Sequence, residues 1–447
     1  MIQFVQQKYR QFVADRKFEE IFKGSAWALG ARVIATALTF ITSIVVARLY
    51  GADMLGVVAV IQSFLSLTTI FTVLGTHNAI LRLIPEHLAK YSATSAYKIY
   101  CTTQSLVLVL SIAVGGILYF FSESIAVKIF AKPQLSSFFA LAALFILFSA
   151  ITQLNTQSVR GLRMIRTFAI MQVLPSFTKL VILLLLTFFY FPPEAPVYAL
   201  LAALLISALT GFFVMNAAFK ERMTSTDRVQ VLSIRELLAL SLPMLMTSAM
   251  TFLIGQTGVI MLGMFRTEAE VGHYDIAVKL ATLTSFALNA INSMAAPKFS
   301  ELFHGNRMEE LFYVAKKSSQ LIFWVTTPIL VGLLACGYPL ITLVYGTEFA
   351  SAYGAMIFLI IGQFVHSISG STGYFMNMTG NHLALRNIML GAVILTITLN
   401  AVLIRPFGII GAAISAMISI IYWNTATLLY IKKKFGKSIG YLPFLIR

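Results

Sequence analysis

Long apolar stretches recur along almost the whole chain, and they constrain its fold more than any other feature of the sequence. We count about twelve stretches of roughly 18–26 mostly uncharged residues, each long enough to cross a hydrocarbon core of about 30 Å. The predicted spans are 24–48, 54–81, 98–121, 135–159, 168–190, 196–219, 237–265, 272–296, 318–341, 355–379, 388–404 and 408–431. Because lipid offers no hydrogen bonds to a backbone, each span is expected to be a helix. The sequence therefore predicts an all-α integral membrane protein with about twelve transmembrane helices.

Basic residues gather on one side of these spans. If the amino terminus is placed inside and the loops alternate, most of the 33 lysine and arginine residues fall on the inside. The inside residues are Lys8, Arg10, Arg16, Lys17, Lys23, Arg82, Lys90, Lys98, Arg160, Arg163, Arg166, Lys220, Arg222, Arg228, Arg235, Lys298, Arg307, Lys316, Lys317, Arg386, Lys432, Lys433, Lys434, Lys437 and Arg447. The outside keeps Arg48, Lys128, Lys132, Arg266 and Arg405. Short loops rich in lysine and arginine stay in the cytoplasm, so both termini are predicted to be cytoplasmic.

The overall charge and the cysteine content exclude several classes of protein. The chain is 58% hydrophobic and 11% charged, with a mean hydropathy of +0.85, which is unlike a soluble domain. Its pI near 9.8 favours anionic inner-leaflet lipid as a partner over nucleic acid, because the positive charge lies in short loops beside the spans. Cys101 and Cys336 both lie in apolar spans, so neither a disulfide nor a metal site is predicted. No enzyme motif and no cofactor motif is found, and we predict a protein that is not an enzyme.

A faint internal repeat predicts how the chain is divided. The corner RLYGADMLGVVAV contains Gly56, and the corner FRTEAEVGHYDIAV contains Gly272; each glycine follows an acidic turn and precedes a helix rich in small residues. We predict two pseudo-symmetric six-helix halves of the same orientation around a central cavity. The predicted parts are an interfacial cytoplasmic tail (1–23), the first half (24–219), a cytoplasmic linker (220–236), the second half (237–431) and a basic cytoplasmic tail (432–447).

Three cations lie inside apolar spans, and they point to a function. They are Arg32, Lys179 and Lys279, in the first, fifth and eighth predicted spans. A charged side chain in mid-bilayer costs at least about 2.5–3.5 kcal/mol, so such residues are expected to face water or an anion. A cavity between the two halves would collect Arg32 and Lys279. A guanidinium that forms two parallel hydrogen bonds, together with an ammonium point charge, suits a diphosphate group.

Each cation also has a structural interpretation. Arg32 and Lys179 lie within about two turns of a cytoplasmic end, and long basic side chains there can reach the inner headgroups. Asp275 precedes Lys279 by four residues, so the two can pair on one helix face. The sequence leaves both interpretations open.

Further polar residues in the spans are candidates for contacts with a substrate or for ion coupling. They are Asp275, His273, His77, Asn289, Asn292, Tyr374 and Asn377. Hydrogen bonds between helices, or a position at a helix end, are the alternative roles for these side chains.

Three strings in the chain resemble a known family. They are GSAWALGARVIATALTFITSIVVARLYGADMLG, YDIAVKLATLTSFALNAINSMAAPKFSEL and GNHLALRNIMLGAVILTITLNAVLIRPFGIIGAAISAMIS. The chain resembles the Wzx-type oligosaccharide flippases of the multidrug/oligosaccharidyl-lipid/polysaccharide exporter superfamily, over nearly its whole length. The resemblance implies movement of a polyprenyl-diphosphate-linked oligosaccharide from the cytoplasmic to the periplasmic leaflet by alternating access, for surface polysaccharides such as O-antigen. It also implies a bacterial inner membrane and, as partners, polysaccharide polymerase and chain-length proteins.

Two other functions stay open. One is a cation-coupled multidrug exporter of the same superfamily, although such an activity favours acidic residues over the basic ones found here. The other is a membrane polysaccharide polymerase or ligase, although every predicted outside loop is short.

Overall fold

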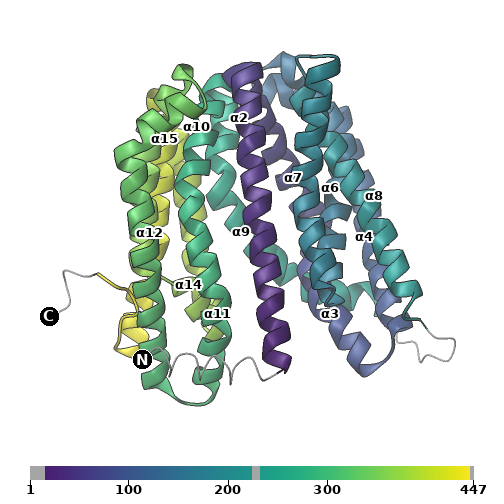
Figure 1. Cartoon of the computed structure of the whole chain (residues 1–447), viewed down its shortest axis with the longest axis vertical. Coiled ribbons are helices and arrows are strands. Elements are labelled where there is room, and N and C mark those ends of the chain that lie inside the picture. Colours follow the sequence, from purple (N-terminus) through teal and green to yellow (C-terminus); the bar gives the residue numbers. More distant parts are fainter. Residues whose placement is uncertain (1–15, 224–231, 443–447) are drawn as a thin grey trace. The chain divides into compact units, whose positions relative to one another are not determined.

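The computed structural model of the chain describes residues 16–223 and 232–442, and all regular structure within these ranges is helical (Figure 1). The helices are α2 (Arg16–Val73), α3 (Thr76–Lys90), α4 (Ala93–Phe120), α5 (Ser122–Ser124), η1 (Ile125–Ile129), η2 (Pro133–Leu135), α6 (Ser136–Gly161), α7 (Ile165–Phe189), α8 (Ala195–Lys220), α9 (Ile234–Phe265), α10 (Glu268–Ala281), η3 (Thr282–Thr284), α11 (Ser285–His304), α12 (Met308–Val344), η4 (Thr347–Ser351), α13 (Ala352–Ser369), α14 (Thr372–Met378) and α15 (His382–Phe435). Parts of the predicted amino-terminal tail (1–15), linker (224–231) and carboxyl-terminal tail (443–447) lie outside the described residues.

Nine helices among the described residues are long and apolar enough to cross a membrane. One of them, α15, holds the predicted spans 388–404 and 408–431, and α2 holds 24–48 and most of 54–81, which continues on α3 after a turn at Gly75. The predicted span 272–296 falls on α10, η3 and α11, where the helix is interrupted. The number of long helices differs from the number of predicted spans because some spans are joined in one helix and others are interrupted. The fold class is confirmed as a multi-pass all-α membrane protein.

Glycines with a left-handed backbone mark the breaks. Inside α2 the chain turns at Gly51, with φ 78°, and inside α15 at Gly408, with φ 55°. A third such residue, Gly370 (φ 68°), separates α13 from α14, and a Cβ on it would overlap the side chain of Ser319. Only glycine takes these angles without a steric cost. The prediction of one continuous helix over 355–379 was wrong, because Gly370 interrupts it.

The described chain forms two compact units. Unit 1 comprises Met1–Thr42, Thr68–Phe120 and Ala140–Leu245, and unit 2 comprises Ser43–Leu67, Phe121–Phe139 and Met246–Arg447. Each unit thus draws on several separate segments, and the predicted halves 24–219 and 237–431 stay a prediction.

The core of unit 1 is built where α3, α4, α6 and α8 meet. Tyr100 on α4 and Phe219 on α8 are fully buried, with ring centroids 5.7 Å apart, among Ile80, Ile84 and Leu154. The Tyr100 hydroxyl donates a hydrogen bond of 2.8 Å to the amide oxygen of Asn155, whose amide nitrogen is buried without a hydrogen-bond partner among the described residues. A second, smaller cluster packs the start of α9 against α3 and α4.

The core of unit 2 is an aromatic cluster. Phe375 on α14 lies 5.5 Å from Phe312, 5.8 Å from Phe299 and 5.9 Å from Phe435, measured between ring centroids. These tilted and edge-to-face arrangements are the favoured geometry for aromatic pairs. The cluster ties α11, α12, α14 and α15 together, and α13 packs against both α12 and α15.

The two corner glycines of the predicted repeat, Gly56 and Gly272, meet inside unit 2. A Cβ on Gly56 would overlap the carbonyl oxygen of Glu268, and a Cβ on Gly272 would overlap that of Ala52. Each corner therefore packs its backbone directly against the other, which only glycine permits.

Candidate functional site

Helix α10 positions the best-defined polar group in unit 2. Its N-cap is Thr267, whose side chain accepts a hydrogen bond from the backbone nitrogen of Glu270 at 3.3 Å. An N-cap threonine of this kind stabilises the first turn of a helix. From this start, Asp275 and Lys279 fall one turn apart on the same face of α10.

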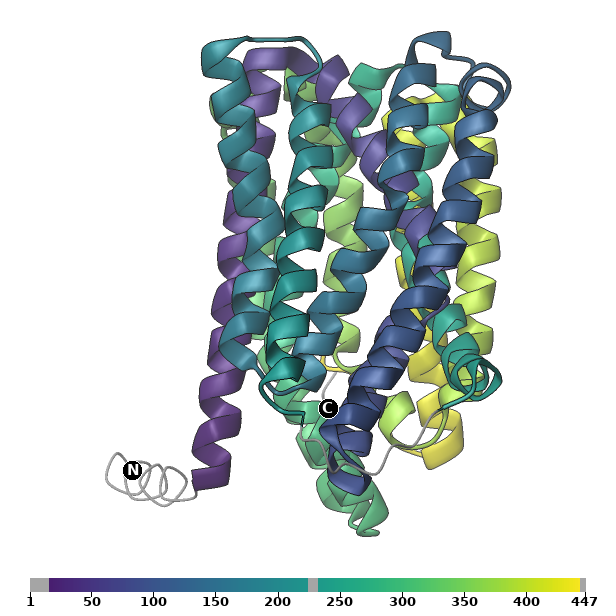
Figure 2. The same cartoon turned by 90° about the vertical axis from the view of Figure 1, so that its right-hand side faces the viewer.

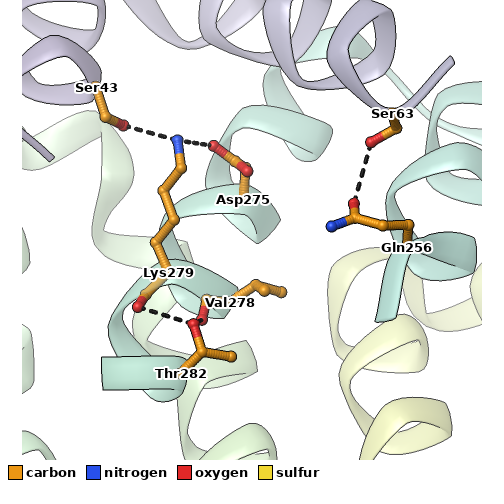
Figure 3. A network of polar contacts seen from close by, with 7 residues as sticks. All are labelled: Ser43, Ser63, Gln256, Asp275, Val278, Lys279 and Thr282. Atoms are coloured by element: carbon orange, nitrogen blue, oxygen red, sulfur yellow. Dashed lines mark hydrogen bonds and ion pairs between the residues drawn. The ribbon is translucent and has the colours of Figure 1, made fainter. Parts of the chain in front are cut away.

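Lys279 is held by two partners (Figure 3). Its Nζ lies 2.5 Å from Oδ2 of Asp275 and 3.2 Å from the Oγ of Ser43 on α2. The Lys279 and Asp275 side chains keep 26% and 17% of their surface exposed. The ion pair is therefore formed in this structure, as the structural interpretation of Lys279 requires, and both side chains stay accessible. A role of Lys279 in binding a substrate stays a prediction.

Arg32 has a different environment. It is exposed on α2, inside the segment Trp27–Val73, which is long and apolar enough to cross a membrane. It makes no ion pair or hydrogen bond with any residue in the part of the chain that the structure describes. A guanidinium in such a place keeps its hydrogen-bond donors available for an anion or for water.

Lys179 is half-buried on α7, four residues after Pro175. The same region of α7 is tied to α2, because the hydroxyl groups of Ser176 and Thr39 lie 3.2 Å apart. Arg32 and Lys179 thus lie on two helices of unit 1 that contact each other (Figures 1 and 2).

Of the two predicted histidines, His77 is buried and His273 is half-buried. In unit 2, Nδ1 of His273 lies 2.8 Å from the Oγ of Ser351, and its ring packs edge-on against Phe349. In unit 1, His77 is 6% exposed and its Nδ1 has no hydrogen-bond partner in the described structure. These contacts place His273 at a packing site, and a coupling role for either histidine stays a prediction.

The predicted amides and tyrosine differ in their burial and in their hydrogen bonds. Asn289 donates a hydrogen bond of 2.7 Å to the carbonyl oxygen of Ser285 within α11. Asn292 is 1% exposed, and neither of its amide atoms has a hydrogen-bond partner among the described residues. Tyr374 and Asn377 are exposed on α14. Asn292 therefore carries an unsatisfied buried amide, whereas Tyr374 and Asn377 are accessible.

The predicted site residues divide between the units. Unit 1 holds Arg32, His77 and Lys179; unit 2 holds Asp275, Lys279 and the others. Within unit 2 the structure brings Asp275 and Lys279 together. A cavity that collects Arg32 and Lys279 stays a prediction. In the described residues, no group of three or more histidines, cysteines, aspartates or glutamates could hold a metal ion.

The sequence reasoning missed several polar contacts of unit 2. Arg48, placed only in an outside loop, donates from Nε to the carbonyl oxygen of Val344 at 2.9 Å and from Nη2 to that of Leu343. Ser63 donates to the amide oxygen of Gln256 at 3.1 Å (Figure 3). The presence of a glutamine inside an apolar span was the available signal, but its partner is 193 residues away.

Glu268 also makes contacts that the sequence analysis did not predict. Its carboxylate lies 3.3 Å from Nζ of Lys132 and accepts a hydrogen bond of 3.0 Å from Nε2 of Gln134. The backbone of the same residue packs on Gly56. Glu268 therefore fixes the segment around η2 to the start of α10, in a way that no local pattern indicates.

Comparison with known sequences identifies the family. Residues 45–353 match the family described as polysaccharide biosynthesis protein. A protein of Haloferax volcanii described as a probable low-salt glycan biosynthesis flippase, Agl15, is 25% identical over 393 residues, which cover 87% of this chain and 79% of the relative. An uncharacterised membrane protein of Methanocaldococcus jannaschii is 20% identical over 419 residues, covering 89% and 81%.

Solved structures share the fold. The lipid II flippase MurJ in an inward closed conformation has a TM-score of 0.74 at 15% identity, covering 92% of this chain and 87% of that protein. An inward-facing multidrug transporter of the MATE family has a TM-score of 0.72 at 14% identity, covering 92% and 98%. Both have the transporter fold of the MOP superfamily, which this chain adopts.

Proposed function

Because the chain belongs to the polysaccharide biosynthesis protein family, we propose that it is a flippase for a polyprenyl-diphosphate-linked oligosaccharide. It moves this lipid from the cytoplasmic to the outer leaflet of the cytoplasmic membrane by alternating access. The similarity to a probable glycan flippase and the MOP-superfamily fold support the class of activity. The basic bias of the predicted inside loops supports the orientation, with both termini cytoplasmic.

The proposal rests mainly on the environment of Arg32. It is an exposed arginine inside an apolar span, with no ion-pair or hydrogen-bond partner among the described residues. An intramembrane cation is costly, so it is expected to face water or an anion, and an anionic substrate group would stabilise it. A diphosphate suits a guanidinium, which can donate two parallel hydrogen bonds to it.

Lys279 and Lys179 have secondary roles in this proposal. Lys279 lies in an ion pair with Asp275 at 2.5 Å, so it can take up the diphosphate by exchanging one carboxylate partner for another anion. Lys179 supplies positive charge to unit 1. A diphosphate carries about two negative charges, so a membrane potential of 100 mV, negative inside, contributes about 4–5 kcal/mol to outward movement.

The test is a flipping assay in proteoliposomes. A polyprenyl diphosphate carrying a labelled sugar is placed in the membrane, and its appearance in the opposite leaflet is followed with an impermeant glycosidase. Arg32→Ala should slow the flipping about 10–150-fold, because a hydrogen bond to a charged group contributes about 1.5–3 kcal/mol. Arg386→Ala is the matched control, since Arg386 is an exposed arginine with only weak contacts to Asn387.

Two results would contradict the proposal. Wild-type protein that leaves the labelled lipid in its original leaflet is not a flippase of this substrate. Efflux of a cationic dye without movement of the lipid would instead assign the protein to the multidrug exporters.

A further inference from the structure

Helices α2 and α7 enclose an apolar groove in unit 1. Its volume is about 710 Å³. Four residues of α2 between Trp27 and Ile34 line it, and a face of α7 between Ala169 and Phe177 lines it from the other side. The lining of α7 extends over about 12 Å along the helix axis, less than half of a hydrocarbon core of about 30 Å. The groove therefore has the length and the apolar lining to hold a hydrocarbon chain of one leaflet.

Arg166 lies in line with this groove. At about 100° per residue, it falls within about 20° of the centre of the groove-lining face of α7. It precedes Ala169, the first lining residue of α7, by about one turn, and it is exposed. Its side chain makes no ion pair or hydrogen bond with any residue that the structure describes. A guanidinium whose donors are available therefore lies at the amino-terminal end of the groove.

The turn before α7 holds a second arginine, in an unfavourable backbone conformation. Arg163 has a φ of 58°, in the left-handed region. The backbone nitrogens of Arg163 and Met164 donate to the carbonyl oxygens of Arg160 and Val159 at 3.0 and 3.2 Å, which is the Schellman pattern at the end of a helix. Glycine is usual at this position, because a side chain there has a steric cost. The chain thus keeps an exposed guanidinium where glycine would be more stable.

Two further arginines lie at the same turn. The guanidinium of Arg160 lies over the ring of Phe168, with 5.5 Å between Cζ and the ring centroid. Arg222, just after α8, donates from Nη1 to the carbonyl oxygen of Leu162 at 3.3 Å, so its charge lies beside the turn. Glu221 is exposed next to Arg222 and forms no ion pair with the described residues. With Glu221 counted, the four arginines still leave a net positive charge here.

We propose that the groove and the arginine turn (Arg160, Arg163, Arg166 and Arg222) form a binding site for one anionic phospholipid of the bilayer, with an acyl chain in the groove and the phosphate at Arg163 and Arg166. With the orientation proposed above, this lipid belongs to the inner leaflet. Guanidinium groups suit phosphate, because they donate two parallel hydrogen bonds to it. The groove continues from the charged turn on one face of α7, so a single phospholipid fills both, whereas a soluble phosphate leaves the groove empty. This resident lipid is distinct from the transported molecule.

The experiment measures the headgroup preference of the groove. The protein is placed in phosphatidylcholine nanodiscs that contain a small fraction of phosphatidylglycerol or phosphatidylcholine, each with a diazirine at the same acyl position. After illumination, mass spectrometry quantifies the labelling of peptides that contain residues 27–34 and 169–177. Each arginine that contacts the phosphate should contribute about fivefold to the preference, so the wild type should favour phosphatidylglycerol about 25-fold.

Substitutions at the arginine turn test the headgroup contacts. Arg166→Gln and Arg163→Gly should each lower the preference for phosphatidylglycerol about fivefold, and the double variant should label equally with both probes. Arg163→Gly should also raise the melting temperature, because it relieves the left-handed strain, while Arg163→Lys should keep most of the preference. Arg82→Gln is the matched control and should behave as wild type, since Arg82 on α3 of the same unit is 64% exposed and has only a 3.7 Å contact with Glu86.

Two glycines test the groove itself. Gly30 lies in the groove and Gly116 lies on α4 of the same unit, and a Cβ on either would meet no atom within 4 Å. Gly30→Phe should therefore fill the groove and lower phosphatidylglycerol labelling of residues 169–177 at least fivefold. Gly116→Phe adds the same bulk to an open position elsewhere and should leave this labelling near wild type.

Several results would overturn this inference. Equal labelling of wild type by both probes, or an unchanged preference in the double arginine variant or in Gly30→Phe, refutes the lipid site. Loss of the preference when inorganic phosphate replaces chloride at matched ionic strength would assign the turn to a soluble phosphate. Displacement of phosphatidylglycerol by an equal amount of polyprenyl diphosphate would make the groove a site for the transported lipid. These measurements need no transport, so a protein that prefers phosphatidylglycerol but does not flip lipid contradicts only the proposed function.

Discussion

The ion pair between Lys279 and Asp275 allows charge neutralisation to be separated from substrate binding. The Nζ–Oδ2 distance is 2.5 Å, and the two side chains are 26% and 17% exposed. Lys279→Ala leaves Asp275 as a largely enclosed carboxylate without its partner. Breaking a fully buried pair costs about 3–5 kcal/mol, whereas an exposed pair on one helix contributes about 0.3–0.5 kcal/mol. With most of both side chains covered, we expect a loss of about 2–3 kcal/mol in the free energy of unfolding.

The double variant distinguishes the two roles. Asp275→Ala combined with Lys279→Ala leaves no unpaired charge, so its stability should return to within about 1 kcal/mol of wild type. If Lys279 also binds the diphosphate, this stable double variant should still flip lipid poorly, while Lys279→Arg should keep part of the activity. Ser43→Ala is a control that keeps the ion pair and removes the hydrogen bond from Lys279 to Ser43.

Unfolding in mixed detergent micelles, followed by the loss of helical circular dichroism, measures the stability of the four variants. The expected loss for Lys279→Ala corresponds to about a 30–150-fold change in the ratio of folded to unfolded protein. A double variant as unstable as Lys279→Ala would refute the neutralisation argument. A double variant with full flipping activity would show that Lys279 is structural, leaving Arg32 as the principal anion ligand.

Three further predictions concern packing, helix capping and orientation. Gly56→Ala or Gly272→Ala should strongly lower thermal stability and flipping, because each new Cβ overlaps a carbonyl oxygen of the facing corner, whereas Gly116→Ala should be near neutral; a tolerated Gly56→Ala would contradict the close packing. Arg48→Ala should destabilise the protein by about 1 kcal/mol, with partial recovery in Arg48→Lys, because Arg48 donates to the last carbonyl groups of α12; an unchanged unfolding curve would contradict this. Single cysteines at Arg222 and Lys437, in a chain with Cys101 and Cys336 replaced, should react with an impermeant maleimide only after the membrane is opened; ready labelling in intact cells would reverse the orientation.

Local pattern was sufficient for several helices of this protein. The predicted span 196–219 corresponds to α8 (Ala195–Lys220), and 168–190 corresponds to α7 (Ile165–Phe189). A membrane helix satisfies its own backbone hydrogen bonds, so its length and its ends follow from a continuous run of apolar residues. The pattern was weaker where a glycine breaks a helix, as at Gly370, because a glycine inside an apolar span is compatible with either a helix or a turn.

The candidate site shows the limit of this reasoning. Arg32 was evident as a charge within an apolar run, and Asp275 was evident as a partner for Lys279 because the two are one helical turn apart. The second partner of Lys279, Ser43, is 236 residues away. No periodicity relates residues so distant, so their meeting depends on how helices from separate segments pack.

The sequence by itself determined the class of protein and which segments are apolar enough to span a membrane, because the hydrocarbon core of the membrane acts on each apolar span separately. The cations within the spans were also visible, since a charge in such a run is costly wherever the span lies. Only the tertiary structure decided which groups these cations meet: it paired Lys279 with Asp275 and Ser43, left Arg32 without a partner among the described residues, and opened the apolar groove between α2 and α7. Such contacts form between side chains that are distant in the chain, and they depend on the packing of one helix against another, which a hydrophobic pattern does not specify.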